Sequence, residues 1–143
     1  MVYGRYFYFS FAFVTLLMGG FIYIHFRDAN ILFLTWLRYL NIDYSSIRQI
    51  NQINSIIMNK IIYNLPNGLW VLSGLLFLNT FSENKILLKD YSIIFITICM
   101  SYEIGQHFNV IPGTFDIFDI IAIIIFSGIG LLANILWRKH EKN

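Results

Sequence analysis

The sequence is poor in charged residues and in cysteine, and each shortage excludes a class of protein. Only 13% of its 143 residues are Asp, Glu, Lys or Arg, about half of the share in an average soluble domain. A single cysteine, Cys99, cannot form an internal disulfide or a cysteine-based zinc cluster. The net charge is only +2, and no basic stretch is interleaved with aromatic residues, so nucleic acid is not an expected partner.

Complete catalytic motifs are also missing. The chain contains no G-x-S-x-G, no H-E-x-x-H, no Walker A loop and no dinucleotide-binding fingerprint. No reaction can therefore be assigned from a motif alone.

Apolar sequence is what the chain has in abundance. Hydrophobic residues make up 57% of it, and the mean hydropathy is +0.64. A helix of about 20 apolar residues crosses the hydrocarbon core of a bilayer. We therefore predict an all-α integral membrane protein, a single domain over residues 1–143 with about four transmembrane helices. The predicted spans are residues 7–26, 66–81, 91–108 and 115–137.

Residues 29–63, between the first two spans, are predicted to form an interfacial, amphipathic segment. Residues 29–42 are apolar but short for a span, and they contain Arg38, which favours an interfacial or re-entrant segment. A fifth span is the alternative, and it would leave the C-terminal tail inside and the turn at 109–115 outside. Isoleucines at helical spacing between Ile47 and Ile61 predict an amphipathic helix on the membrane surface or across the end of the bundle. A helix that docks a partner protein is the alternative.

Turn signals separate the later spans. Pro66 is expected in the first turn of the second span, where its missing N–H costs nothing. Residues 82–90 are expected to form a charged loop, and Pro112-Gly113 predicts a turn between the third and fourth spans.

The positions of Lys and Arg predict an orientation. With both termini and the 82–90 loop on one side, that side carries six of the ten Lys and Arg residues. The other side carries four, Arg27, Arg38, Arg48 and Lys60, spread over a longer loop, and the turn at 109–115 carries none. The termini are therefore predicted to be cytoplasmic and the turn to face outward. The abundance of Ile, Asn, Lys and Tyr suits an AT-rich bacterial genome, so we expect a multi-pass protein of a bacterial plasma membrane.

Polar residues flanking this turn are the main functional clue. Glu103, Gln106 and His107 are spaced i, i+3 and i+4, so they share one helix face. Asp116 and Asp119 follow the turn at a spacing of i, i+3. Polar groups are expensive to bury in hydrocarbon. We therefore predict that these five residues form a binding site at the outer membrane surface.

Residues 91–137 contain three carboxylates and neither Lys nor Arg. Like charges repel strongly at low dielectric, so a compensating group is needed. A carboxylate can be protonated, a divalent metal can bind, or a cation can come from elsewhere in the chain. The candidate cations are Arg27, Arg38 and Arg48. The candidate metal ligands are Glu103, His107, Asp116 and Asp119, of which Glu103, His107 and Asp119 are also the candidate catalytic residues.

A simpler interpretation exists for part of this cluster. Asp116 can cap a helix N-terminus, and Asp119 would then lie in the first turn, where the helix dipole favours an anion. Glu103 lies before a helix C-terminus, where the dipole disfavours an anion, so this interpretation does not extend to it.

The pattern Glu103-x-x-Gln106, a short turn, and Asp116-x-x-Asp119 at the start of a Gly-containing span resembles the signature of VanZ-like membrane proteins. The resemblance covers residues 91–137, with Leu65–Trp70 in the place of the family's earlier span start. It implies a small bacterial protein of a few transmembrane helices. The family's named member is associated with resistance to the glycopeptide antibiotic teicoplanin, and no enzymatic mechanism comes with the resemblance.

Two family positions differ in this chain. The family often has an Arg shortly before the Asp pair, but the turn here reads Pro112-Gly113-Thr114-Phe115. An Asn usually follows the second Asp by four residues, and that position is Ile123. The missing Arg is the cation that the charge balance requires.

Three functions are compatible with these features. The first is a VanZ-like protein of the cell envelope that binds a membrane lipid, a lipid-linked or cell-wall-related polar group, or a cation. The second is a metal-assisted hydrolase or transferase acting on a lipid headgroup. The third is a structural subunit of a membrane complex, in which the cluster holds helices together.

Overall fold

The computed structural model describes residues 2–26, 32–45, 56–81 and 85–140. Within these ranges the chain is helical and contains no β-strand, so the all-α prediction is confirmed. The helices are α1 (Val2–Phe26), α2 (Leu32–Tyr39), α3 (Ile56–Phe81), α4 (Lys85–His107) and α5 (Ile117–His140).

Three segments are long and apolar enough to cross a membrane: Arg5–Phe26, Met58–Phe81 and Ile117–Leu136. They correspond to the first, second and fourth predicted spans. The third predicted span falls in α4, which carries Lys89, Asp90 and Glu103 and is not among these segments.

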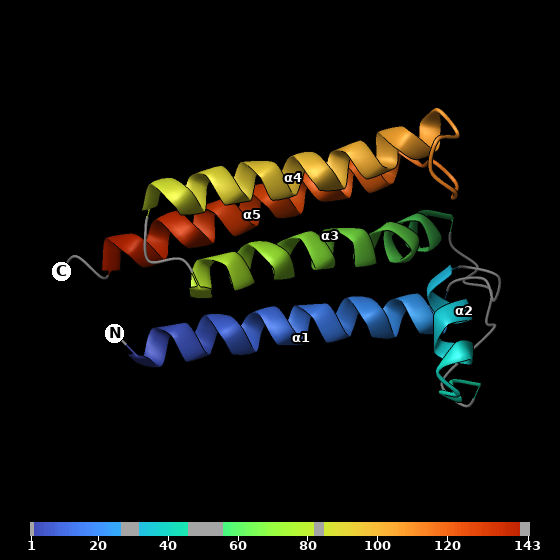
Figure 1. The fold of residues 1–143 in the computed structure, drawn as a ribbon, viewed down its shortest axis with the longest axis horizontal. Helices are drawn as coiled ribbons and strands as arrows, with labels where there is room; N and C mark the ends of the chain where they lie inside the picture. Colours follow the sequence, from blue (N-terminus) through green and yellow to red (C-terminus); the bar gives the residue numbers. More distant parts are fainter. Residues whose placement is uncertain (1, 27–31, 46–55, 82–84, 141–143) are drawn as a thin grey trace.

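The long helices α1, α3, α4 and α5 lie alongside one another, and consecutive long helices run in opposite directions (Figure 1). One end of the bundle holds the start of α1, the end of α3, the start of α4 and the end of α5. The other end holds the start of α3 and the turn between α4 and α5. The short helix α2 lies across this second end, beside the end of α1 (Figure 1).

The core is centred on α3, which packs most extensively against α1 and α5 and much less against α4. On one side of α3, Leu72 and Leu76 pack against Ala12 of α1. On another, Val71 and Leu75 form a cluster with Ile123 of α5. The central helix α3 therefore holds α1 and α5 together.

Two interhelical hydrogen bonds also hold α1 in place. Ser73 of α3 donates its hydroxyl to the carbonyl oxygen of Ala12 at 2.7 Å. Tyr8 of α1 donates its hydroxyl to the carbonyl oxygen of Ala133 of α5 at 2.9 Å. Such bonds satisfy polar groups that hydrocarbon would leave without a partner.

The outward faces of the long helices carry large apolar side chains. Phe7 of α1, Ile94 of α4, and Leu132 and Ile135 of α5 are each more than half exposed. An apolar surface of this extent is unusual for a soluble monomer and is typical of contact with lipid.

Helix boundaries differ from the sequence prediction at three places. α3 begins at Ile56 rather than near Pro66, which lies inside the helix and is buried. A proline inside a helix removes one backbone hydrogen bond, and packing against neighbouring helices makes this tolerable. α4 begins at Lys85, so residues 85–90 are helical rather than part of a charged loop; Leu88, which is buried, extends the packed face of α4.

The third difference concerns the predicted interfacial segment. Among the described residues of this segment, only Leu32–Tyr39 forms a separate helix, of 8 residues. At 1.5 Å per residue this helix is about 12 Å long and too short to span a bilayer. The last part of the segment, from Ile56 on, belongs to α3. Residues 46–55, the start of the predicted amphipathic helix, lie outside the described residues.

A Schellman motif ends α4 and starts the turn that leads to α5. Asn109 has a left-handed backbone, with φ at 56°. The N–H of Val110 donates to the carbonyl of Gly105, and that of Asn109 donates to the carbonyl of Gln106. This is the usual way for a helix to satisfy its last carbonyl groups. It reverses the chain within a few residues and brings α5 back beside α4.

Candidate functional site

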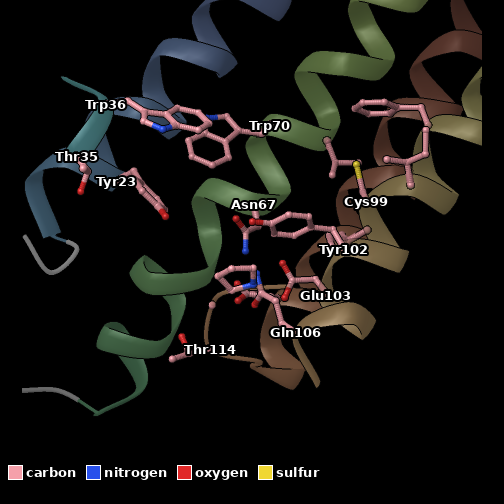
Figure 2. A pocket seen from close by; sticks show the side chains of 17 residues that line it. Tyr23, Thr35, Trp36, Asn67, Trp70, Cys99, Tyr102, Glu103, Gln106 and Thr114 are labelled. Atoms are coloured by element: carbon pink, nitrogen blue, oxygen red, sulfur yellow. The ribbon is translucent and has the colours of Figure 1, made fainter. Parts of the chain in front are cut away.

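A cavity of about 930 Å³ lies at the end of the bundle that carries α2 and the α4–α5 turn. Every helix contributes to its wall, as does the turn itself (Figure 2). The lining residues that bear on its chemistry are Tyr23, Trp36, Asn67, Trp70, Val71, Phe95, Ile98, Cys99, Tyr102, Glu103, Gln106, Gly113, Thr114, Asp119 and Ile123. Its volume falls within the range of cavities that hold small organic ligands.

The wall is divided into a polar and an apolar part. Asn67 of α3 and Glu103 and Gln106 of α4 lie close together near the turn (Figure 2). Deeper in the bundle the wall is formed by apolar side chains such as Phe95 and Ile98. Along α4, the distance from Phe95 to Gln106 is about 16 Å at 1.5 Å per residue. The cavity therefore offers a polar end and an apolar end to one molecule.

Two carboxylates line this cavity from different helices. Glu103 comes from the last part of α4 and Asp119 from the first turn of α5, and their side chains are only 5% and 3% exposed. Glu103 Oε2 and Asp119 Oδ1 are buried oxygens that accept no hydrogen bond from the described residues, although both side chains have other interactions. The site therefore concentrates acceptor groups, and negative charge wherever these acids are ionised, at its polar end.

Gly113 allows the turn to close over Gln106. Its φ is 149°, which L side chains rarely adopt. A β-carbon at position 113 would lie 2.7 Å from Cδ of Gln106. Both residues line the cavity, so glycine is needed here for the turn to complete the polar wall.

Aromatic side chains form another part of the wall. The rings of Tyr23 and Trp70 are 5.0 Å apart at an interplanar angle of 45°. Trp70 in turn packs on Gly19, where a β-carbon would lie 2.6 Å from the indole nitrogen. Trp36 of α2 and Tyr102 of α4 also line the cavity, and both are exposed on one side. These rings give the cavity wall an aromatic part in addition to its polar groups.

Asp116 has the capping role that the simpler interpretation predicted. Its Oδ1 accepts a hydrogen bond from the N–H of Phe118 at 3.0 Å. Phe118 is the second residue of α5, so this is an N-cap bond. It is not part of the cavity wall. Asp116 therefore starts the helix that presents Asp119.

His107 also lies outside the cavity wall. It is exposed, and its ring packs against those of Phe108 and Phe115, with centroids 5.1 and 4.7 Å away. Of the five predicted binding residues, Glu103, Gln106 and Asp119 are thus brought to one cavity, and His107 and Asp116 are not.

The predicted metal ligands do not converge. Among the described residues, no group of three or more His, Cys, Asp or Glu side chains is placed so that it could hold a metal ion. Ca²⁺ takes about six to eight oxygen ligands, more than the side chains of Glu103 and Asp119 supply. The four candidate ligands therefore do not form one metal site in the described part of the chain.

The candidate compensating cations fall into two groups. Arg38 is exposed on α2, where Nη2 donates to Oγ1 of Thr35 at 3.3 Å, and it does not line the cavity. Arg27 and Arg48 lie outside the described residues. A further cation, Lys60 of α3, places Nζ 4.4 Å from the ring centroid of Phe118, and it too lies outside the cavity wall.

Several lining residues were not predicted as members of the site. Asn67 is a polar residue in the apolar part of α3, and its cost of burial is a signal that sequence reasoning can use. Trp70 and Tyr102 give no such signal, because aromatic residues are common near both membrane surfaces.

A scan of this chain against protein-family models finds no match. A search of the curated proteins and one of the solved structures also return no match.

Proposed function

We propose that this chain is a multi-pass integral membrane protein that crosses the bilayer with four helices, α4 being the fourth. The three apolar segments support the first part of the proposal. The position of α4 beside α3 and α5, with exposed Ile93 and Ile94 on its outer face, supports the second. Two of the polar residues that lower the hydropathy of α4, Glu103 and Gln106, line the cavity instead of facing lipid.

The cavity end of the bundle faces outward in this proposal, and both termini face the cytoplasm. Lys and Arg at the opposite end support this orientation. The test is a Cys99→Ala protein carrying Val110→Cys in the exposed turn. A membrane-impermeant maleimide is expected to label it in intact cells. Labelling only after the cells are opened would show that the turn faces the cytoplasm, and the proposed orientation would be wrong.

The function that the site supports best is binding of an amphiphile, a molecule with a polar head and an apolar body. The observation that carries this proposal is that one cavity has both a polar end, around Glu103 and Gln106, and an apolar end, around Phe95 and Ile98. Lipids and lipid-linked envelope precursors have this form. The apolar end matches an acyl or isoprenoid chain, and the polar end supplies hydrogen-bonding groups for a head.

Blocking the polar end tests this proposal. Thr114→Trp places a bulky ring at the cavity wall, and Thr114 is exposed, so the fold should tolerate the change. Val110→Trp is the matched control, because Val110 lies in the same turn, is 78% exposed and does not line the cavity.

Native mass spectrometry of the purified variants measures the co-purified amphiphile. The wild-type protein and Val110→Trp are expected to retain it, and Thr114→Trp to retain about tenfold less. Equal retention by all three would contradict binding in this cavity.

The resemblance to VanZ-like proteins extends the proposal to the bacterial cell envelope. Two acidic positions of that signature, Glu103 and Asp119, line the cavity together with Gln106, which supports a shared binding role. Expression in a susceptible Gram-positive host is expected to raise the inhibitory concentration of teicoplanin. Glu103→Gln and Asp119→Asn should abolish the increase, and Asp116→Asn, outside the cavity, should preserve it.

Unchanged drug sensitivity with all of these proteins, at normal abundance, would remove the link to glycopeptide resistance. It would favour the structural role, in which the buried carboxylates hold α4 and α5 together.

A further inference from the structure

We propose that the cavity opens sideways into the bilayer, between α4 on one side and α1 and α2 on the other, and that its ligand is a membrane lipid that enters there. This inference rests on the proposed function, because it states where the bound amphiphile comes from. The alternative source is a water-borne amphiphile that enters at the end of the bundle.

The helices that form the two sides of the cavity do not pack against each other. Figure 2 shows Tyr23 and Trp36, from α1 and α2, on one side of α3 and Tyr102 of α4 on the other. α3 packs against both α1 and α4. In the described part of the chain, neither α1 nor α2 packs extensively against α4. No helix contact therefore closes the cavity between these two sides.

Side chains on both edges of this opening are exposed and also line the cavity. Ile98 of α4 is 61% exposed, and Tyr102, one turn further along α4, is exposed as well. Trp36 of α2 is exposed on the opposite edge. These three residues belong to the cavity wall and to the outer surface of the bundle at the same time. We call the opening between them the lateral opening.

The lateral opening reaches the depth of the lipid chains. At 1.5 Å per residue, Ile98 lies about 14 Å from His107, the last residue of α4. The hydrocarbon core of a bilayer is about 30 Å thick. With α4 as a span, Ile98 is therefore level with the acyl chains of the leaflet at the cavity end. Ile94, one turn deeper on α4, is exposed and apolar, so the surface beside the opening also suits contact with lipid.

Entry through the lateral opening suits a molecule with a long apolar chain. To reach the cavity from water, such a molecule must first leave the bilayer, and exposure of each methylene group to water opposes that step. Through the lateral opening, the chain passes from hydrocarbon to the apolar end of the cavity around Phe95 and Ile98. The head moves along the membrane surface to Asn67 and Gln106 at the polar end. The geometry thus favours a lipid of the bilayer over a water-borne ligand.

Quenching of Trp70 by brominated lipid tests the inference. Trp70 lines the cavity, and it is the only tryptophan left in a protein with Trp36→Phe and Trp137→Phe. Protein that native mass spectrometry shows to be free of amphiphile is placed in nanodiscs. These contain dioleoyl phosphatidylcholine or its analogue with bromine at carbons 9 and 10 of each chain. Bromine quenches tryptophan fluorescence on contact.

Two reference positions bracket the signal, each in a protein that also carries Trp70→Phe. Ile94→Trp reports a position that faces lipid, and Val110→Trp reports the exposed turn. Trp70 is expected to be quenched nearly as strongly as the reference at position 94. The reference at position 110 should be quenched little, because the turn lies outside the hydrocarbon in the proposed orientation.

A bulky group at the lateral opening should protect Trp70. Ile98→Cys in the Cys99→Ala background is labelled with N-cyclohexylmaleimide before reconstitution, and most of the quenching of Trp70 should be lost. Ile94→Cys with the same label is the matched control, because Ile94 is exposed on the same helix and does not line the cavity. Quenching in the control should be unchanged.

Three results would overturn the inference. Quenching of Trp70 no stronger than at position 110, in a protein that still co-purifies with an amphiphile, would show that the cavity binds but is closed to the bilayer. The proposed function would then stand. Equal quenching with the label at either position would show that lipid reaches Trp70 by another route. Neither quenching nor a co-purified amphiphile would remove the proposed function as well.

Discussion

Phe95 of α4 packs directly on Gly74 of α3, in the space that a β-carbon at position 74 would occupy. The contact between α4 and α3 is less extensive than the contacts that α3 makes with α1 and with α5. The packing of Phe95 on Gly74 is therefore important for holding α4 against α3. Phe95 also lines the apolar end of the cavity. The shape of the cavity therefore depends on the absence of a side chain at position 74.

Gly74→Val should separate α4 from α3. The added side chain overlaps the ring of Phe95, and overpacking of this kind destabilises a protein by about 1–3 kcal/mol. Gly128→Val is the matched control, since a β-carbon at Gly128 meets nothing within 4 Å. Thermal unfolding in detergent is the measurement. A melting temperature for Gly74→Val equal to that of Gly128→Val would show that Phe95 moves away at no cost.

Ser73→Ala should weaken the contact between α3 and α1. The variant loses the buried hydrogen bond from Ser73 to the carbonyl of Ala12, which is worth about 0.5–1.5 kcal/mol. Thr97→Ala is the control, because Thr97 is exposed and bonds only to the carbonyl of Ile93 in its own helix. Unfolding by sodium dodecyl sulfate compares the two variants. Equal stability would mean that the interhelical bond contributes nothing.

Asn134→Leu should leave stability unchanged or raise it by about 1 kcal/mol, because a buried amide without hydrogen bonds is itself destabilising. Both Oδ1 and Nδ2 of Asn134 are buried without a partner among the described residues. Asn64→Leu is the comparison, because the amide of Asn64 does form a hydrogen bond: its Nδ2 donates to the carbonyl of Lys60 at 2.7 Å. Asn64→Leu should therefore destabilise. Unfolding by sodium dodecyl sulfate compares the stabilities of the two variants. A larger loss of stability in Asn134→Leu than in Asn64→Leu would indicate that water or a partner satisfies the amide of Asn134.

Asp116→Ala should loosen the first turn of α5. Loss of the bond from the N–H of Phe118 to Oδ1 of Asp116 is expected to lower stability by about 1 kcal/mol, whereas Asp116→Asn should retain it. Hydrogen exchange at the amide of Phe118 measures the effect locally. Faster exchange in the alanine variant alone is the expected pattern, and equal protection in both variants would contradict it.

The sequence predicted the helices better than it predicted which residues meet. Spacing placed Glu103, Gln106 and His107 on one helix face, but only the first two line the cavity. At about 100° per residue, Gln106 and His107 lie on opposite flanks of Glu103. The position of α3 decides which flank faces the cavity. Periodicity along α4 alone contains no information about that neighbour.

The boundary of α3 was missed for a related reason. Proline at the first turn is the locally favoured arrangement, and it predicted a helix starting at Pro66. In the structure, Pro66 is buried inside a helix that starts at Ile56. Packing of the whole helix outweighs one lost hydrogen bond, and a local signal cannot report that balance.

The short length of α2 has a consequence for reporter design. Because α2 lies across the end of α1 without crossing the bundle, α3 returns beside α1, and the start of α1 and the end of α5 lie at the same end of the bundle (Figure 1). Complementary halves of a split fluorescent protein, fused to the N- and C-termini of one chain, should therefore meet and assemble in a single compartment. Insertion of the protein in the reverse orientation would move both halves together, so assembly would report the fold independently of its direction in the membrane.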